Sequence, residues 1–109
     1  MIVSGGFNVF PREVEDVVGE HPAVAQVGVI GTPDEKWGEA VTAVVVLREG
    51  RQLTDDVVTE IKDAVRQRKG SVHAPKQVIA TDALPLTPLG KPDKNALRQQ
   101  FWQGERRVG

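Results

Sequence analysis

Lys91 stands in a segment whose backbone is restricted by proline and glycine: LPLTPLGKPDK, residues 84–94. The three prolines limit the conformations open to Lys91, and Gly90 permits a close approach to another surface. An ammonium held in this way needs no reordering before it meets an anion, which is what electrostatic stabilisation of a transition state requires. The alternative is an ordinary solvated lysine in a loop. The segment makes Lys91 a candidate catalytic cation.

Two further segments contain residues that a purely structural domain does not require. SGGFN, residues 4–8, has paired glycines, which lose much conformational entropy on folding, so their backbone freedom must be needed. This segment is either an ordinary hairpin turn or a loop whose bare backbone lies beside a ligand.

DEKWGE, residues 34–39, places Trp37 among charged residues. There the indole either packs in a small apolar cluster apart from the main core or provides a face on which a planar ring stacks.

The pattern of apolar residues predicts the elements that position these segments. Pro11 suits the first turn of a helix, and Thr54 suits the N-cap of another. AVTAVVVL is almost continuously apolar and β-branched, as in a central strand covered on both faces. Gly31-Thr32-Pro33-Asp34 breaks the strand before it. We expect a hairpin at 1–10, strands at 24–30, 40–47 and 77–81, and helices at 11–20, 54–70 and from 92 onward.

This order of elements predicts the fold class. A chain of 109 residues fits one domain with a modest core. Strands and helices alternate, and a small mixed or antiparallel sheet covered by helices is the economical arrangement. We therefore expect an α+β domain: a central three-stranded sheet flanked by helices, with a two-stranded hairpin at the N-terminus.

Composition narrows the classes of function and location. With 14 basic and 15 acidic residues the net charge is −1, which gives no electrostatic case for nucleic acid or an anionic membrane. The chain has no cysteine and only two histidines, His21 and His73, so we expect no metal site. No apolar run approaches the roughly 20 residues of a transmembrane helix, and the first residues lack a secretory pattern. We expect a cytoplasmic domain.

Taken in this order and at these distances, the three segments resemble the C-terminal domain of the adenylate-forming superfamily. That superfamily includes acyl-CoA synthetases, nonribosomal peptide adenylation domains and firefly-type luciferases. The resemblance covers nearly the whole chain, about residues 1–101, and Phe7 followed by Asn8 is closer to fatty-acyl-CoA synthetases than to aryl-CoA ones. The segments that carry it are SGGFNVFPREVEDVV, HPAVAQVGVIGTPDEKWGEAVTAVVVL and LPLTPLGKPDKNALR with its Gly-Lys pair.

The resemblance implies a two-step ligase. A carboxylic acid, expected to be a fatty acid, attacks the α-phosphate of Mg·ATP and gives an acyl-adenylate and pyrophosphate. The thiol of CoA, or of a carrier-protein phosphopantetheine, then displaces AMP. Residues 1–103 would be the mobile C-terminal domain, which rotates between the steps, and residues 104–109 a flexible tail. The N-terminal domain that binds ATP and the acid would lie outside these residues, so the chain alone would be inactive.

The resemblance also assigns roles to residues. Lys91, preceded by Gly90, matches the catalytic lysine of adenylation, where an ammonium would stabilise the negative charge of the transition state. The glycine turn would approach the active site in the thioester step and leave room for the pantetheine arm. An aromatic side chain would stack on the adenine of CoA, and lysines would meet its phosphates as point charges. The residues assigned to CoA in this way are Gly5, Gly6, Phe7, Trp37 and Lys76, with Lys69 as a further candidate.

Two alternatives fit the same residues. The chain is similar to other adenylate-formers, such as peptide-synthetase adenylation domains with a carrier-protein partner, and acid specificity in the superfamily is set in the larger domain. A non-catalytic binding module with the same fold is the second alternative. Against that module stands the rigid setting of Lys91, which docking alone does not need.

Overall fold

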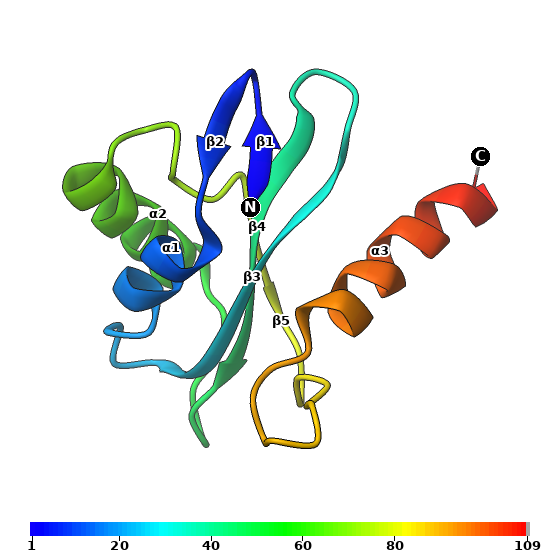
Figure 1. Cartoon of the computed structure of the whole chain (residues 1–109). Coiled ribbons are helices and arrows are strands. Elements are labelled where there is room, and N and C mark those ends of the chain that lie inside the picture. The colour runs from blue at the N-terminus through cyan, green and yellow to red at the C-terminus, as the bar shows by residue number, and fades with distance from the viewer. Residues whose placement is uncertain (109) are drawn as a thin grey trace.

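The computed structural model describes the backbone of residues 1–108 and the side chains of residues 1–101. Five strands form one sheet and three helices cover it (Figure 1). In that part of the chain, none of the helices has both the length and the apolar character needed to cross a bilayer. The elements are β1 (Ile2–Ser4), β2 (Phe7–Val9), α1 (Pro11–Val18), β3 (Val24–Asp34), β4 (Gly38–Leu47), α2 (Asp55–Lys69), β5 (Gln77–Ala80) and α3 (Lys94–Val108).

The central strand of the sheet is β4. It pairs antiparallel with β3 along its whole length and parallel with β5 over residues 42–45. β1 and β2 form the expected N-terminal hairpin, and Ser4 of β1 bridges to Gly38 at the start of β4. The hairpin thereby joins the three remaining strands in one mixed sheet. The expected α+β class, with a sheet flanked by helices, is confirmed.

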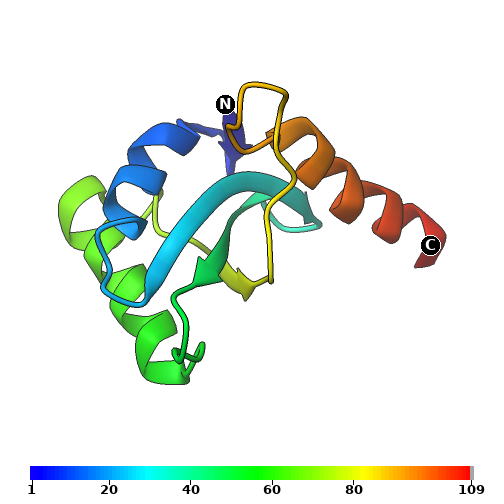
Figure 2. The ribbon, with the colours of Figure 1, turned by 90° about the horizontal axis from the view of Figure 1, so that it is seen from below.

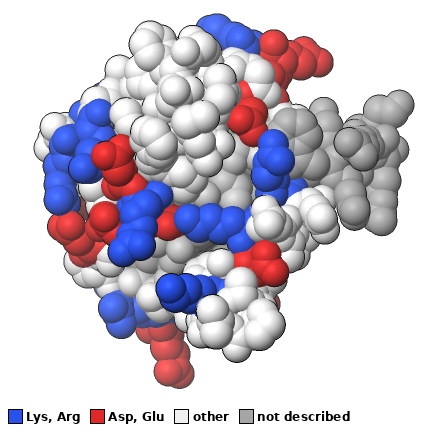
Figure 3. Space-filling model, in the orientation of Figure 1, with Lys and Arg blue, Asp and Glu red and all other residues white. Residues whose placement is uncertain are grey.

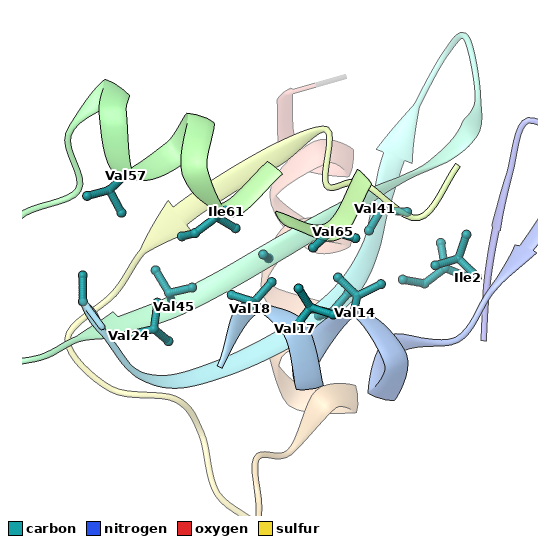
Figure 4. Packing of buried hydrophobic residues seen from close by; sticks show 14 residues of the cluster. Ile2, Val14, Val17, Val18, Val24, Val41, Val45, Val57, Ile61 and Val65 are labelled. Carbon is teal, nitrogen blue, oxygen red and sulfur yellow. The ribbon is translucent and has the colours of Figure 1, made fainter. Parts of the chain in front are cut away.

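The two faces of the sheet are covered by different helices. α1 and α2 lie on one face and α3 on the other, which is plain when the molecule is seen from below (Figure 2). Figure 4 shows the side chains of α1 and α2 meeting those of the strands on the first face. The main contributors from the two helices are Val14, Val17, Val18, Val57, Ile61 and Val65. The smaller cluster on the second face consists of Ile30, Val44, Leu84 and Leu97, with Val46 and Phe101 at its edge.

The hairpin of β3 and β4 is longer than the sequence indicates. The expectation that the strand ends at Ile30 is wrong: β3 continues to Asp34, and the register continues through Pro33 opposite Glu39. The hydroxyls of Thr32 and Thr42 share a buried hydrogen bond of 2.9 Å. Pro33 is tolerated because β3 lies at the edge of the sheet, where no further strand needs an N–H donor. Side-chain pairing therefore overrides the turn propensity of these residues.

The ends of the helices differ from expectation by a few residues. α1 ends at Val18 rather than at residue 20, because the backbone then turns through i→i−3 hydrogen bonds from Glu20 and His21. α3 begins at Lys94 rather than at residue 92, because the carboxylate of Asp93 accepts the N–H of Ala96 and caps the first turn.

Two other expectations concern chain segments at helix ends. The N-cap of α2 is confirmed, since the hydroxyl of Thr54 accepts the N–H of Val57 at 3.2 Å. The flexible tail expected at residues 104–109 lies outside the residues whose side chains the structure describes, and it stays a prediction.

The buried threonine pair gives a test of this packing. Thr42→Val should lower the free energy of unfolding by about 1–3 kcal/mol, because it leaves the buried hydroxyl of Thr32 without that partner. The double variant Thr32→Val/Thr42→Val removes both hydroxyls and should recover most of the loss. Urea unfolding of the wild type, Thr32→Val, Thr42→Val and the double variant measures the coupling. Additive losses in the double variant would contradict the hydrogen bond.

Candidate functional site

The lysine loop, residues 84–93, is closed by its own backbone hydrogen bonds. The N–H of Thr87 donates to the carbonyl of Lys91 at 2.7 Å, and the N–H of Gly90 donates to the carbonyl of Thr87 at 2.9 Å. Gly90 has a φ of +82°, a conformation that strains residues with a Cβ. The backbone that carries Lys91 is therefore fixed by turn geometry, as the sequence predicts.

Both ends of the lysine loop are anchored to the protein. The N–H of Asp93 donates to the carbonyl of Pro85 at 2.7 Å and closes the base of the loop. Leu84 lies directly before this base and Leu97 one turn into α3, and both are buried in the smaller apolar cluster with Ile30. The loop projects from the sheet between two points that cannot move independently of the core.

The side chain of Lys91 is exposed. Among the side chains of residues 1–101, none forms an ion pair with it. Leu86 and Leu89 of the same loop are 55% and 85% exposed, so the loop carries an ammonium beside two apolar side chains that have little cover of their own. The structure thus has the rigid, outward-facing lysine that a cation acting on another surface requires.

A second group of predicted residues gathers at the opposite end of the sheet, near the tips of the β1–β2 and β3–β4 hairpins (Figure 1). We call Gly5, Phe7, Trp37 and Lys76 the tryptophan cluster. Three separate segments supply it, and the N–H of Gly5 donates to the carbonyl of Trp37 at 2.9 Å. The residues assigned to CoA from the sequence are largely brought together, while the lysine loop is held apart from them.

Gly5 is required by the indole that lies against it. Its φ is +58°, and a Cβ at this position would lie 2.7 Å from Cε3 of Trp37. Gly6 also has a positive φ, +85°, but nothing lies within 4 Å of the place its Cβ would take. The two glycines therefore serve different purposes: one provides space for a side chain, and the other provides only the turn.

The indole of Trp37 is 37% exposed and lies between cations. The ammonium groups of Lys36 and Lys76 are each 5.0 Å from its ring centroid, within the range of a cation–π interaction. Beside the ring is a cavity of about 150 Å³, lined by Ser4, Phe7, Trp37, Ser71, Val72 and Lys76. Cations, an aromatic face and bare backbone meet here, which are the groups that bind phosphates and a planar base.

The structure adds one residue to this cluster and leaves two candidates, Gly6 and Lys69, outside it. Lys36 was not singled out from the sequence, although its position next to Trp37 is the signal that it could have given. Lys69 is exposed in the last turn of α2 and does not line the cavity beside the indole.

Charge is distributed unevenly over the face shown in Figure 3. Basic and acidic side chains are intermixed across it, whereas uncharged residues cover the area over the β1–β2 hairpin. Exposed apolar side chains of this hairpin are Met1, Val3, Phe7 and Phe10. Within the part of the chain whose side chains are described, no three His, Cys, Asp or Glu residues are arranged to hold a metal ion.

Comparison with known proteins gives the family. Residues 13–91 match the model of the AMP-binding enzyme C-terminal domain. The chain is 67% identical over 112 aligned residues to the medium/long-chain-fatty-acid–CoA ligase FadD8 of Mycobacterium tuberculosis, covering 99% of this chain and 20% of that protein. It is 46% identical to the indoleacetate–CoA ligase of Aromatoleum aromaticum, covering 91% of this chain and 19% of that protein. The chain thus spans about a fifth of the length of these curated relatives.

A solved structure has the same fold. The acyl-CoA synthetase of Brucella canis superimposes with a TM-score of 0.87 at 32% identity, covering 97% of this chain and 19% of that one. The elements and their arrangement in the present chain therefore correspond to one domain of a larger protein of known structure.

The contact between Gly5 and the indole can be tested in a Trp102→Phe background, where fluorescence reports on Trp37 alone. Gly5→Ala should lower the free energy of unfolding by about 1–3 kcal/mol and shift the emission to the red, because the methyl group displaces the ring into solvent. Gly6→Ala is the matched control, since it has the positive φ without the contact. Identical emission spectra for the two variants would contradict the packing.

Proposed function

Because this chain belongs to the family of AMP-binding enzyme C-terminal domains, we propose that it is the mobile C-terminal domain of an AMP-forming acyl-CoA synthetase that activates a fatty acid. Residues 1–103 form this domain, and the ATP and acid sites belong to the remainder of the enzyme, so the chain alone is inactive. One observation supports the assignment above all: Lys91 is exposed on a rigid loop, and no side chain of residues 1–101 forms an ion pair with it.

In the adenylation step, Lys91 acts on the reacting atoms. A carboxylate oxygen of the acid attacks the α-phosphorus of ATP, the bond to the bridging oxygen breaks, and pyrophosphate leaves with Mg²⁺. Negative charge gathers on the attacking carboxylate and the α-phosphate oxygens. The ammonium of Lys91 donates hydrogen bonds to these oxygens and stabilises the transition state more than the bound substrates.

The setting of Lys91 suits this role. The turn hydrogen bonds of the lysine loop fix its backbone before it meets the substrates, so little ordering is left for the moment of reaction. Leu86 and Leu89 supply apolar surface beside the ammonium, and this surface would be covered when the loop enters the active site of the larger domain. Lys91 must be exposed in this domain if its ammonium is to enter the active site of the larger domain.

The thioester step uses the tryptophan cluster. The thiol of CoA attacks the acyl carbon and gives up its proton, and the bond between that carbon and the phosphate oxygen breaks, so that AMP leaves. The exposed indole of Trp37 stacks on the adenine, Lys36 and Lys76 meet phosphates, and the backbone at Gly5 and Gly6 leaves room for the pantetheine arm. One lysine moves off the ring as the base stacks, and its ammonium becomes available to a phosphate.

The separation of the two surfaces supports a rotation between the steps. The lysine loop and the tryptophan cluster lie at opposite ends of the sheet (Figure 1), so one orientation of the domain presents only one of them to an active site. A domain with this arrangement serves two successive reactions by turning as a unit. This is the alternation that the proposed two-step reaction needs.

The proposal of a fatty acid rests on the relative that is 67% identical, which is named a medium/long-chain-fatty-acid–CoA ligase. The relative at 46% identity is named for indoleacetate, which supports an acid pocket outside this domain. ATP and CoA as substrates also favour a cytoplasmic location.

The role of Lys91 predicts a selective defect in the complete enzyme. Lys91→Ala should lower acid-dependent pyrophosphate release by about 10²- to 10³-fold, because one donor to the developing charge is lost. Formation of acyl-CoA from supplied acyl-adenylate should be unchanged. Lys91→Arg serves as the comparison, since it keeps the charge but not the compact ammonium, and should recover only part of the rate. Equal loss of both half-reactions would rule out the assigned role.

The role of Trp37 predicts a defect in the thioester step that spares adenylation. Trp37→Ala should raise the KM for CoA by about tenfold or more, as stacking of a base is worth roughly 1–3 kcal/mol, and should leave pyrophosphate release unchanged. Trp37→Phe keeps an aromatic face and should lose less. Pantetheine, which lacks the adenine, is the matched control acceptor and should not distinguish the variants. An equal defect with pantetheine would refute stacking on the base.

A further inference from the structure

We propose that Glu39 is a positioning residue that holds the lysine loop in place, acting through Arg98 of α3, and that it ties this loop to the β1–β2 hairpin at the same time. The inference rests on the proposed function of Lys91, because it concerns the placement of that ammonium. Glu39 does not touch the substrates in this scheme. It acts through the two elements that its carboxylate joins.

Each oxygen of the Glu39 carboxylate has a partner of its own. Oε1 accepts the N–H of Val3 in β1 at 3.0 Å, and Oε2 accepts a hydrogen bond from Nη2 of Arg98 at 2.9 Å. The side chain of Glu39 is only 18% exposed. A partly buried carboxylate with two directed partners fixes geometry better than a fully exposed ion pair, which contributes little.

α3 transmits this contact to the lysine loop. The helix begins at Lys94, three residues after Lys91, and no flexible linker intervenes. Lys94 and Arg98 are one turn apart on the helix, so they share a face. Lys94 forms an ion pair with Glu15, whose carboxylate also accepts the N–H of Val29 at 2.8 Å. Two carboxylates that each accept a strand N–H therefore also form ion pairs with the first turns of α3.

Apolar packing alone does not fill the space between the hairpin and α3. A cavity of about 300 Å³ lies there, and Met1, Ile2, Glu39 and Arg98 are among the residues that line it. Leu97 packs into the smaller apolar cluster, but the side of α3 that faces β1 meets the sheet through charged groups. Glu39 therefore bridges β1 and α3 beside this cavity.

Gly31 provides the room that this carboxylate occupies. A Cβ at Gly31 would lie 2.7 Å from Oε2 of Glu39 and 3.2 Å from Cγ2 of Ile2. Gly31 does not have a positive φ, so its conformation alone does not demand glycine. A side chain at position 31 would require the end of the Glu39 side chain to shift, so glycine there leaves the observed position of this carboxylate open.

Displacement of α3 would move Lys91 with it, since the loop is closed and continuous with the helix. A misplacement of about 1 Å at a reacting centre can lower a rate by about 100-fold. Loss of the Glu39 charge should therefore affect the step that uses Lys91 and spare substrate binding.

The test uses Glu39→Gln in the complete enzyme. Glutamine keeps an oxygen for the N–H of Val3 but loses the charge that holds Arg98. We expect acid-dependent pyrophosphate release to fall about 10- to 100-fold in kcat with the KM for ATP unchanged. Acyl-CoA formation from supplied acyl-adenylate should be unchanged. Glu20→Gln is the matched control, because Glu20 is also ion-paired, at 2.7 Å, but to Arg68 of α2, which lies on the other face of the sheet from α3.

A double variant separates positioning from general destabilisation. If Glu39 acts through Lys91, adding Glu39→Gln to Lys91→Ala should cause no further loss of adenylation. A multiplied loss would overturn the inference. Arg98→Gln breaks the same contact from its half-exposed side, so the test remains decisive if Glu39→Gln does not fold.

The outcomes also separate this inference from the proposed function. If Lys91→Ala retains adenylation, the proposed function fails. If Lys91→Ala loses adenylation while Glu39→Gln and Arg98→Gln keep the wild-type rate, only the positioning role of Glu39 fails.

Discussion

The structure depends on one constraint: β4 must be covered on both faces. Residues 40–45 are all buried, so helices on one face of the sheet alone cannot cover this strand. α1 and α2 cover one face, and Leu84 and Leu97 close the other. These two leucines flank the lysine loop, and with both of them buried the segment between them lies outside the core. The exposure of Lys91 is therefore a consequence of how the central strand is covered.

The same sheet keeps the two functional surfaces apart. The long β3–β4 hairpin carries Trp37 at its tip, and pairing of Ser4 with Gly38 brings the glycine turn to that tip. The lysine loop follows β5, which runs parallel to β4 and so delivers the chain to the opposite end. Rigid strands thus set the distance between a cation and an aromatic cluster, as the proposed alternation between two reaction steps would need.

Sequence reasoning succeeded where local chemistry decides. Pro11, the Thr54 cap and the β-branched run of β4 specify their elements directly, and the three prolines specify the rigid setting of Lys91. It failed where the structure depends on contacts between residues far apart in the sequence. The extension of β3 depends on the bond between Thr32 and Thr42, and Glu39 is one of 15 acidic residues until Val3 and Arg98 meet it. These two contacts join residues that are 36 and 59 positions apart in the sequence, so no local pattern announces them.

Charged contacts between α3 and the sheet also suit a domain that turns as a unit. Apolar surfaces tolerate small sliding, whereas a carboxylate that joins a strand N–H to a guanidinium has one favourable geometry. Burial of Glu39 carries a desolvation penalty, which its two directed hydrogen bonds offset. In return the hairpin and α3 are locked to each other, so the tryptophan cluster and the lysine loop keep a constant relation.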